Sequence, residues 1–436
     1  MGYLRKELSL LGGTILFMNI VIGAGLLSLP GLVYMQVGAW ALLSWVFTGL
    51  VSLPLLMVFI YLGKNYPDSG GIAHYALRAF GIKGQQIAAF IFLGAVCFGL
   101  PSIALTGAYY IDAIFPYKPH AYAVLLIIFS TSLHMFSNRG IAKILSIIGS
   151  SVIVILFVLI GISVFGINMN NLTATLTPHS PISLLNLSSI LSPFMMIFFA
   201  FTGWEIGAHV SEEFKNAKRD FPLAMIVSYI LTLLLYGVIA WIVQTAKIGT
   251  HFETPFVEIT GYVLGSKGRY FVSFVAVVLI VANLFSALWG VSRLVFSLAR
   301  DEIFPTFLAK TRDGVPLYAV ISVLLMLLSI TLISASGFFE LKKMLAIAGQ
   351  NFLILYGIAA LCLFKLTTNK WLKTLSIGVC ALIIFILYLA GVSLFYPLLL
   401  TILAIFNSIL QQRARAVGRN SGLPRIAPNG EKEQNQ

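Results

Sequence analysis

The sequence predicts an all-α polytopic membrane protein with twelve transmembrane helices. Of its 436 residues, 59% are hydrophobic and only 10% are charged, whereas a soluble domain has roughly a quarter of its residues charged. Apolar stretches of about 20 residues, each able to cross about 30 Å of hydrocarbon as a helix, recur along the chain. Because backbone polar groups must be satisfied internally in lipid, and because the alternating pattern of a membrane barrel is absent, we expect helices.

The predicted spans follow one another with short connections, so we expect a single transmembrane domain over residues 1–411. The spans cover residues 10–35, 38–62, 84–113, 120–137, 141–167, 185–211, 221–246, 270–298, 316–336, 342–365, 371–391 and 393–411. The polar stretch 247–268 contains residues 255–264, which could form a short helix at the outer surface. Residues 412–436 are polar and predict a disordered cytoplasmic tail.

The distribution of positive charge predicts the orientation in the membrane. With the N-terminus in the cytoplasm, most of the 28 lysines and arginines fall on the cytoplasmic side. The outer segments hold only Lys118, Lys247, Lys267, Arg269, Lys342 and Lys343. This asymmetry predicts an even number of crossings with both termini cytoplasmic. The net charge of +13 therefore reflects orientation and argues against nucleic-acid binding.

The three cysteines indicate neither a metal site nor a redox site. Cys97, Cys362 and Cys380 all fall within predicted spans, where we expect them to be small apolar residues of the packing. Their spacing matches no zinc or thiol-exchange motif. No cofactor or metal is expected.

Two spans contain features that interrupt a helix. In the first span, Gly23 and Gly25 lie on either side of Ala24 at mid-membrane. In the sixth, Gly203 lies at a similar depth, close to the carboxyl group of Glu205. The two spans are five crossings apart, so they would begin two halves of opposite orientation, residues 8–167 and 185–365. Interrupted helices at corresponding positions indicate an inverted-repeat transporter, although a small-residue packing face would also explain the first pair.

The interruptions would expose backbone groups suited to a zwitterion. A second half-helix starting near Leu26 would present free N–H groups and a positive dipole end to a carboxylate. The first half of the sixth span would end near Phe199 and Phe201 and present free carbonyl groups to an ammonium group. Together these groups match the main chain of an amino acid.

Fifteen residues are candidates for binding this substrate: Ile22, Gly23, Ala24, Gly25, Leu26, Leu100, Ile103, Phe199, Ala200, Phe201, Thr202, Gly203, Trp204, Asn283 and Ser286. Phe199 and Trp204 would line the side-chain pocket together with Leu100, Ile103, Asn283 and Ser286. Glu205 is the one ionisable residue there, which favours neutral, mainly apolar side chains. Asn283 and Ser286 lie one turn apart and would bind substrate, bind Na⁺ or hold helices together.

Few other titratable residues fall within the predicted spans. Glu205 has either a role in proton coupling or gating, or a structural role as a protonated, hydrogen-bonded carboxyl group. Asp112 is expected at the outer interface, and His134 and His209 are expected to be packing or interface residues. His74 lies in a glycine-rich stretch that would line an inner mouth. These groups are scattered, so we do not expect an enzyme.

Several motifs resemble those of the amino acid–polyamine–organocation (APC) superfamily of permeases. They are Ile22-Gly23-Ala24-Gly25-Leu26-Leu27-Ser28-Leu29-Pro30, the segment from Phe199 to Glu205, Lys215-Asn216-Ala217-Lys218-Arg219-Asp220-Phe221-Pro222, and Ala299-Arg300-Asp301-Glu302-Ile303-Phe304-Pro305. The resemblance implies the LeuT-like APC fold, a 5+5 inverted repeat with broken helices 1 and 6, followed by two extra helices at 371–411. It also implies alternating access.

Within the superfamily, residues 66–74 and 211–216 resemble bacterial exporters of methionine and branched-chain amino acids. This narrower resemblance implies an inner-membrane antiporter that exports methionine, leucine, isoleucine and valine and is coupled to protons. It also implies that Phe199 gates the substrate and that Glu205 has a gating or proton-linked role. Ile20 stands where relatives often carry Asn, and the fifth span has no Lys beyond Lys143, which leaves the coupling ion open.

Three alternatives stay open from the sequence. One is a proton-coupled importer, and another is an exchanger with other substrates, such as cationic amino acids or polyamines. A remote alternative is a membrane receptor or enzyme without transport activity. The oligomeric state is not predicted.

Overall fold

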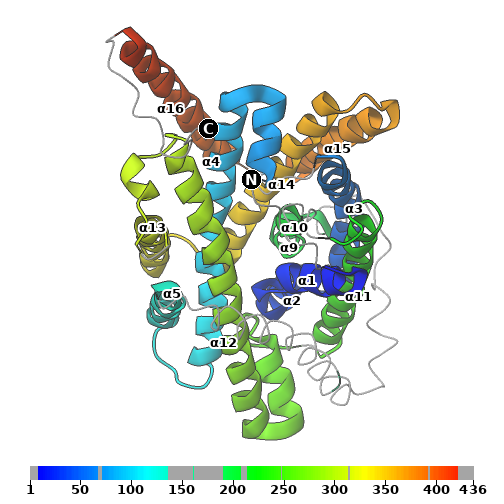
Figure 1. The fold of residues 1–436 in the computed structure, drawn as a ribbon. Coiled ribbons are helices and arrows are strands. Elements are labelled where there is room, and N and C mark those ends of the chain that lie inside the picture. The colour runs from blue at the N-terminus through cyan, green and yellow to red at the C-terminus, as the bar shows by residue number, and fades with distance from the viewer. Residues whose placement is uncertain are drawn as a thin grey trace.

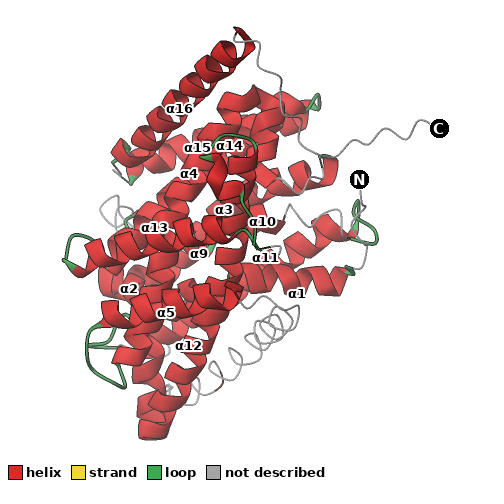
Figure 2. Cartoon of the chain, turned by 60° about the vertical axis from the view of Figure 1, so that its left-hand side comes forward, coloured by secondary structure: helices red, strands yellow, loops and turns green. Residues whose placement is uncertain are grey.

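The computed structural model describes residues 8–66, 71–135, 161, 190–207, 214–246, 248–312, 315–390 and 393–420. This part of the chain consists of helices and their connections, as Figure 2 shows. Its only extended pairings are two isolated bridges, Leu8 with Phe214 and Arg312 with Val315. The prediction of an all-α protein is therefore confirmed. The predicted fifth span, 141–167, lies almost wholly outside the described residues.

The helices follow the predicted spans closely. They are α1 (Leu10–Val21), α2 (Ala24–Val37), α3 (Ala41–Asn65), α4 (Gly71–Asp112), α5 (Pro119–Met135), α9 (Phe194–Ala200), α10 (Trp204–Gly207), α11 (Asp220–Ala246), α12 (Pro255–Arg300), α13 (Leu317–Ala335), α14 (Leu341–Leu366), α15 (Lys370–Leu389) and α16 (Phe395–Asn420), with short 3₁₀ helices at Gly38–Trp40 and Thr306–Ala309. Seven helical stretches of the described chain are long and apolar enough to cross a membrane, and α5 and α16 contain shorter apolar ones.

Two glycines bend the longest helices. Gly81 in α4 has φ +71° and Gly265 in α12 has φ +64°, a left-handed conformation that glycine adopts without a steric penalty. The bend at Gly265 separates residues 255–264 from the rest of α12, so the predicted short helix before the eighth span is confirmed. The bend at Gly81 likewise separates a first helical segment from the rest of α4, which contains the predicted third span.

The chain's last described helix extends beyond its predicted end. We expected the helix to stop at residue 411 and a disordered tail to follow, but α16 continues to Asn420. The added residues include Gln, Arg and Ala, which have high helix propensity. The predicted tail is therefore wrong up to Asn420, and residues 421–436 lie outside the described part of the chain.

The helices surround one main hydrophobic core. The helix α4 packs against α5, α12, α14 and α16, and α14 packs in turn against α9. The four short helices α1, α2, α9 and α10 lie together beside α11 (Figure 1). The helix α15 is peripheral, and Ile377, Ile384 and Phe385 on it are 58%, 68% and 57% exposed. Such an apolar outer surface suits contact with lipid.

Candidate functional site

The first span is interrupted as the sequence predicts. The helix α1 ends at Val21, and α2 begins at Ala24 rather than near Leu26, two residues earlier than expected. Ile22 is extended, and Gly23 occupies the N-cap position of α2, where it has no side chain to accept from the first amides. The first N–H groups of a helix have no acceptor within it. The uncapped N-terminus of α2 can therefore bind an anion.

The second interruption separates α9 from α10. The backbone leaves the helix at Phe201 and resumes it at Trp204, and Gly203 between them has φ +111°. Residues with side chains rarely adopt that conformation, so glycine is needed to turn the chain here. The hydroxyl of Thr202 donates to the carbonyl of Phe199 at 2.7 Å. The end of α9 is thus partly satisfied by its own sequence.

The two interruptions lie against each other. A Cβ atom added at Gly25 would lie 3.0 Å from Cβ of Ala200, so α2 and α9 meet at nearly backbone distance. A Cβ atom added at Gly203 would lie 3.1 Å from Cγ2 of Ile20 in α1. The helices α2 and α9 that flank the two interruptions therefore contact each other, and Gly203 of the second interruption contacts α1. The packing role that the sequence left open for Gly25 is present in the structure.

Tyr236 of α11 joins the ends of both first half-helices. Its hydroxyl group lies 3.1 Å from the carbonyl oxygen of Val21, the last residue of α1. It lies 3.1 Å from the carbonyl oxygen of Ala200, the last residue of α9. One hydroxyl proton is thus shared between two helix C-termini that have lost their own hydrogen-bond donors. Tyr236 was not predicted from the sequence, although it is a polar residue within an apolar span.

Glu205 is buried and bonded to two donors. Its Oε2 atom accepts from the backbone N–H of Gly203 at 2.9 Å and from the hydroxyl of Tyr356 at 2.7 Å. Tyr356 lies on α14 and packs edge-on against Phe59 and Phe198. Glu205 therefore connects α10 with α14 and holds the turn between α9 and α10. Tyr356 was also not predicted as a site residue.

The polar pair of the eighth span is divided in the structure. A Cβ atom added at Gly23 would lie 2.5 Å from Nδ2 of Asn283, so this amide lies directly against the first interruption. Ser286 is exposed and its hydroxyl donates to the carbonyl of Ala282 in its own helix at 3.0 Å. Of the two predicted residues, Asn283 is the one that the structure brings to the interruption.

The aromatic candidates point to different neighbours. The ring of Phe199 reaches within 3.0 Å of the position a Cβ would take at Gly99 on α4, and lies 6.2 Å from the ring of Phe352 on α14. The ring of Trp204 is buried and lies 5.5 Å from that of Tyr229 on α11. We expected Phe199 and Trp204 to line one pocket, but their ring contacts are with different helices.

The remaining candidates also have defined surroundings. Leu100 and Ile103 are buried in the main core, and Phe201 contacts Tyr229 and Tyr236. For Ala24 only the backbone is described, as the first residue of α2.

The other titratable residues lie apart from the interruptions. His134 is stacked on Phe285 at 4.2 Å and its Nε2 lies 3.1 Å from that residue's carbonyl oxygen, which confirms it as a packing histidine. Asp112 accepts from the backbone of Tyr117 just after α4, and His74 bonds to Arg78. His209 lies outside the described residues. Within the described part of the chain, no three His, Cys, Asp or Glu side chains gather as a metal site would require.

Comparison with known proteins identifies the family. A family model described as amino acid permease matches residues 8–420. An uncharacterized amino acid permease of Bacillus subtilis, YecA, is 31% identical over 316 residues, which cover 70% of this chain and 72% of the relative. The L-methionine/branched-chain amino acid exporter YjeH of Escherichia coli is 28% identical over 243 residues, 55% of this chain and 56% of the exporter. The putrescine transporter PotE of Haemophilus influenzae is 26% identical over 74% of this chain and 76% of its own length.

Proposed function

The chain belongs to the amino acid permease family, and we propose that it is a secondary active transporter of neutral, mainly apolar L-amino acids. The observation that carries this proposal is the contact between the two helix interruptions, with Gly25 against Ala200. The uncapped start of α2 would bind the substrate carboxylate. The carbonyl group of Ala200, the last residue of α9, would bind the ammonium group, since its oxygen accepts one hydrogen bond from Tyr236 and retains a second lone pair.

The proposed site combines backbone groups of the interruptions with side chains of α4 and α12. Phe199 would cover the substrate from the α4 side, and Asn283 would approach it from α12. Leu100 and Ile103 would form the apolar wall. Trp204 packs against α11, so in our proposal it shapes the turn after Gly203 instead of contacting the substrate side chain. Methionine, leucine, isoleucine and valine fit these mainly apolar surroundings.

We propose proton-coupled export as the direction of transport. The relative YjeH is named an exporter of methionine and branched-chain amino acids, and Glu205 is a carboxyl group buried between α10 and α14 that could take up and release a proton. The alternatives are proton-coupled import and exchange of cationic amino acids or polyamines. The similarity to a protein named a putrescine transporter supports the polyamine alternative.

The proposed architecture has twelve spans in the cell inner membrane with both termini cytoplasmic. In it, α1 with α2 and α9 with α10 would begin two inverted repeats, at about residues 8–167 and 185–365, and α15 and α16 would be the two extra helices. The first two pairs would reorient against the rest of the bundle during alternating access.

Transport by the purified protein in liposomes tests the function. Radiolabelled methionine or leucine is supplied outside, and a pH gradient is imposed in either direction. We expect accumulation that depends on the gradient, is competed by neutral apolar amino acids, and is insensitive to arginine, glutamate and putrescine. Competition by arginine or putrescine would contradict the proposed substrate class and favour cationic amino acids or polyamines. Equal uptake with and without the pH gradient would argue against proton coupling.

A further inference from the structure

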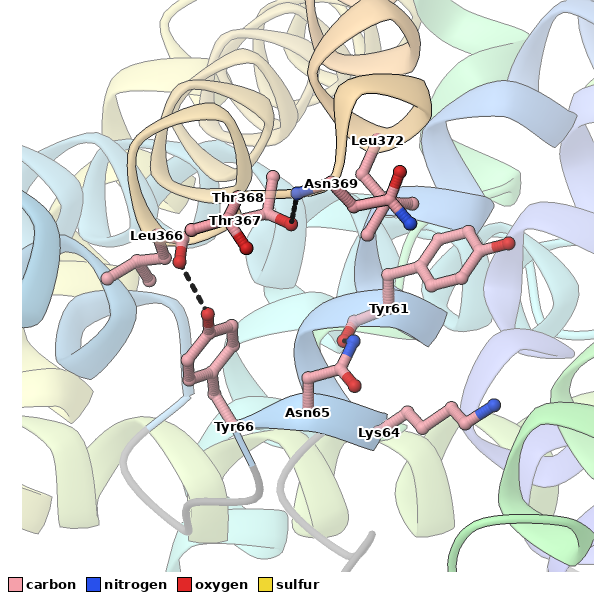
Figure 3. Close-up of a pocket in the computed structure, with 9 residues that line it drawn as sticks. All are labelled: Tyr61, Lys64, Asn65, Tyr66, Leu366, Thr367, Thr368, Asn369 and Leu372. Atoms are coloured by element: carbon pink, nitrogen blue, oxygen red, sulfur yellow. Dashed lines mark hydrogen bonds between the residues drawn. The ribbon is translucent and has the colours of Figure 1, made fainter.

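A polar cavity lies away from the interruptions, at one end of the bundle. Its volume is about 480 Å³ and it is lined by the end of α3, the connection between α14 and α15, and the first turn of α15 (Figure 3). The lining residues are Tyr61, Lys64, Asn65, Tyr66, Leu366, Thr367, Thr368, Asn369 and Leu372. The charge asymmetry predicts that this end faces the cytoplasm.

Hydrogen bonds fix the walls of this cavity. The hydroxyl of Tyr66 donates to the carbonyl of Leu366 at 2.6 Å and thereby ties the end of α3 to the end of α14 (Figure 3). The backbone N–H of Asn369 donates to Oγ1 of Thr367 at 3.2 Å, and the side chain of Asn369 accepts from the N–H of Trp371 at 2.9 Å. The cavity is therefore a built feature of the connection between α14 and α15.

Among the residues that the structure describes, those charged at the cavity or in the adjoining connection are lysines. Lys64 is exposed and lines it, while Lys365, Lys370 and Lys373 lie on or beside the connection that forms its other wall. None of the nine lining residues is acidic. Tyr66 already donates to Leu366, but the hydroxyl groups of Tyr61 and Thr368 and the side-chain amide of Asn369 also line the cavity and are of the kind that donates hydrogen bonds to an anion. A phosphate group matches both the charge and the donors.

The position of the cavity indicates that a lipid carries this phosphate. Trp371 is 58% exposed at the start of α15, and its ring lies edge-on to that of Tyr61 at 5.6 Å. Tryptophan and tyrosine of this kind are typical of the membrane–water interface. Beyond Trp371, Ile377, Ile384 and Phe385 form an exposed apolar surface on α15. An acyl chain lying along that surface would bring its headgroup to the cavity.

We propose that this cavity binds the phosphate headgroup of an anionic membrane lipid, with Lys64 of its lining as the charged contact and Lys370, the first residue of α15, adding positive charge beside it. The site is separate from the substrate site, so it gives the transporter a means of responding to lipid composition. Because Tyr66 and Asn65 end α3, a bound lipid would also stabilise the packing of α3 against α14 and α15.

Native mass spectrometry of the full-length protein tests this site. The protein is extracted from an equimolar mixture of phosphatidylglycerol and phosphatidylcholine, and the retained lipids are counted. We expect selective retention of phosphatidylglycerol, reduced in Lys64→Gln/Lys370→Gln by about fivefold or more, as expected for the loss of basic residues near an anionic membrane surface. Thr368→Trp, which fills the cavity without changing charge, should reduce retention as well.

The control removes the same charge elsewhere. Lys215→Gln/Lys218→Gln alters exposed lysines in the turn before α11, on the same predicted side of the membrane, and should retain phosphatidylglycerol as the wild type does. Equal loss in both double variants, or no loss in either, would overturn the site. Displacement of the lipid by millimolar inorganic phosphate would reassign the cavity to a soluble anion. Melting temperatures in detergent exclude misfolded variants, and because lipid retention is measured without transport, failure here leaves the proposed function standing.

Discussion

At the scale of single residues, Phe199 is the aromatic side chain that links the interruption of the sixth span to α4 and α14. Its ring lies within 3.0 Å of the position that a Cβ atom would take at Gly99, and its ring centre lies 6.2 Å from that of Phe352. If it covers the bound substrate, Phe199→Ala will raise the half-saturation constant for leucine, by roughly tenfold for a loss of about 1.4 kcal/mol in binding. Leucine uptake by reconstituted protein measures this. Phe385→Ala on the exposed surface of α15 is the matched control, and an unchanged constant in Phe199→Ala would remove this residue from the gate.

The carboxyl group of Glu205 is our candidate for the group that binds and releases the coupled proton. Glu205→Gln keeps the size of the side chain and an oxygen that can accept from Gly203 and Tyr356, but it can no longer bind a proton. We expect residual transport whose rate no longer follows pH, measured as leucine flux across a series of buffer pH values. Tyr356→Phe, which removes one donor and keeps the carboxyl group, should retain a pH dependence. A wild-type profile in Glu205→Gln would make the carboxyl group structural.

At the scale of secondary structure elements, the contact between α2 and α9 depends on Gly25. A Cβ atom there already comes within 3.2 Å of both the Cβ and Cα atoms of Ala200, so a leucine side chain cannot fit unless the two helices separate. Gly25→Leu should therefore abolish leucine transport while the protein stays folded. Gly378→Leu is the control, because nothing lies within 4 Å of a Cβ added there in α15. Wild-type flux in Gly25→Leu would refute the placement of the site.

A smaller change separates packing from substrate binding at this contact. Gly25→Ala adds one methyl group and leaves the backbone N–H in place, so we expect reduced transport from the wider spacing of α2 and α9. Adding Ala200→Gly removes the opposing methyl group and should restore much of the flux. Leucine uptake by the two variants measures this, and continued loss in the double variant would show that the added methyl group occupies substrate space.

Tyr236 holds the two first half-helices by one hydroxyl group. Tyr236→Phe leaves the carbonyl groups of Val21 and Ala200 with fewer donors in a buried setting, which costs about 1–3 kcal/mol. We expect a lower melting temperature in detergent together with weaker leucine transport. Tyr229→Phe is the control, because Tyr229 donates to the carbonyl of Gly49 on α3. A comparable loss of transport in both variants would indicate that Tyr236 affects transport only through the stability of the fold.

The interruptions were predictable because their cause is local. Glycine weakens a helix wherever it stands, so Gly23, Gly25 and Gly203 marked both breaks in the sequence. Partners across the bundle were not predictable, since a tyrosine in a span can face any neighbour. For that reason Tyr236 and Tyr356 were missed. The neighbours of Trp204 were likewise not predictable, because the turn at Gly203, with φ +111°, sets which way α10 faces.

At the scale of the whole molecule, composition and the recurring apolar stretches predicted the all-helical architecture and most helix ends. These properties reflect the membrane, which demands long apolar helices whatever their packing. The end of α16 was misjudged because polarity alone suggested disorder, whereas Gln, Arg and Ala also favour helix. Bends such as that at Gly81 were not foreseen, since a single glycine within a helical pattern does not reveal its φ angle.

The charge asymmetry makes a prediction about the whole chain that is independent of transport. If both termini are cytoplasmic, Lys118 after α4 and Lys343 at the start of α14 lie outside, and Lys370 at the start of α15 lies inside. All three are exposed. In a background with Cys97, Cys362 and Cys380 replaced by alanine, single cysteines at these positions report their side of the membrane. A membrane-impermeant maleimide applied to intact cells should label Lys118→Cys and Lys343→Cys, and should label Lys370→Cys only after permeabilisation. Lys118 and Lys343 share a side only if an even number of crossings separates them. Labelling of only one of these two positions in intact cells would contradict the predicted spans between them. Labelling of Lys370→Cys in intact cells would contradict the assignment of the lipid site to the inner leaflet.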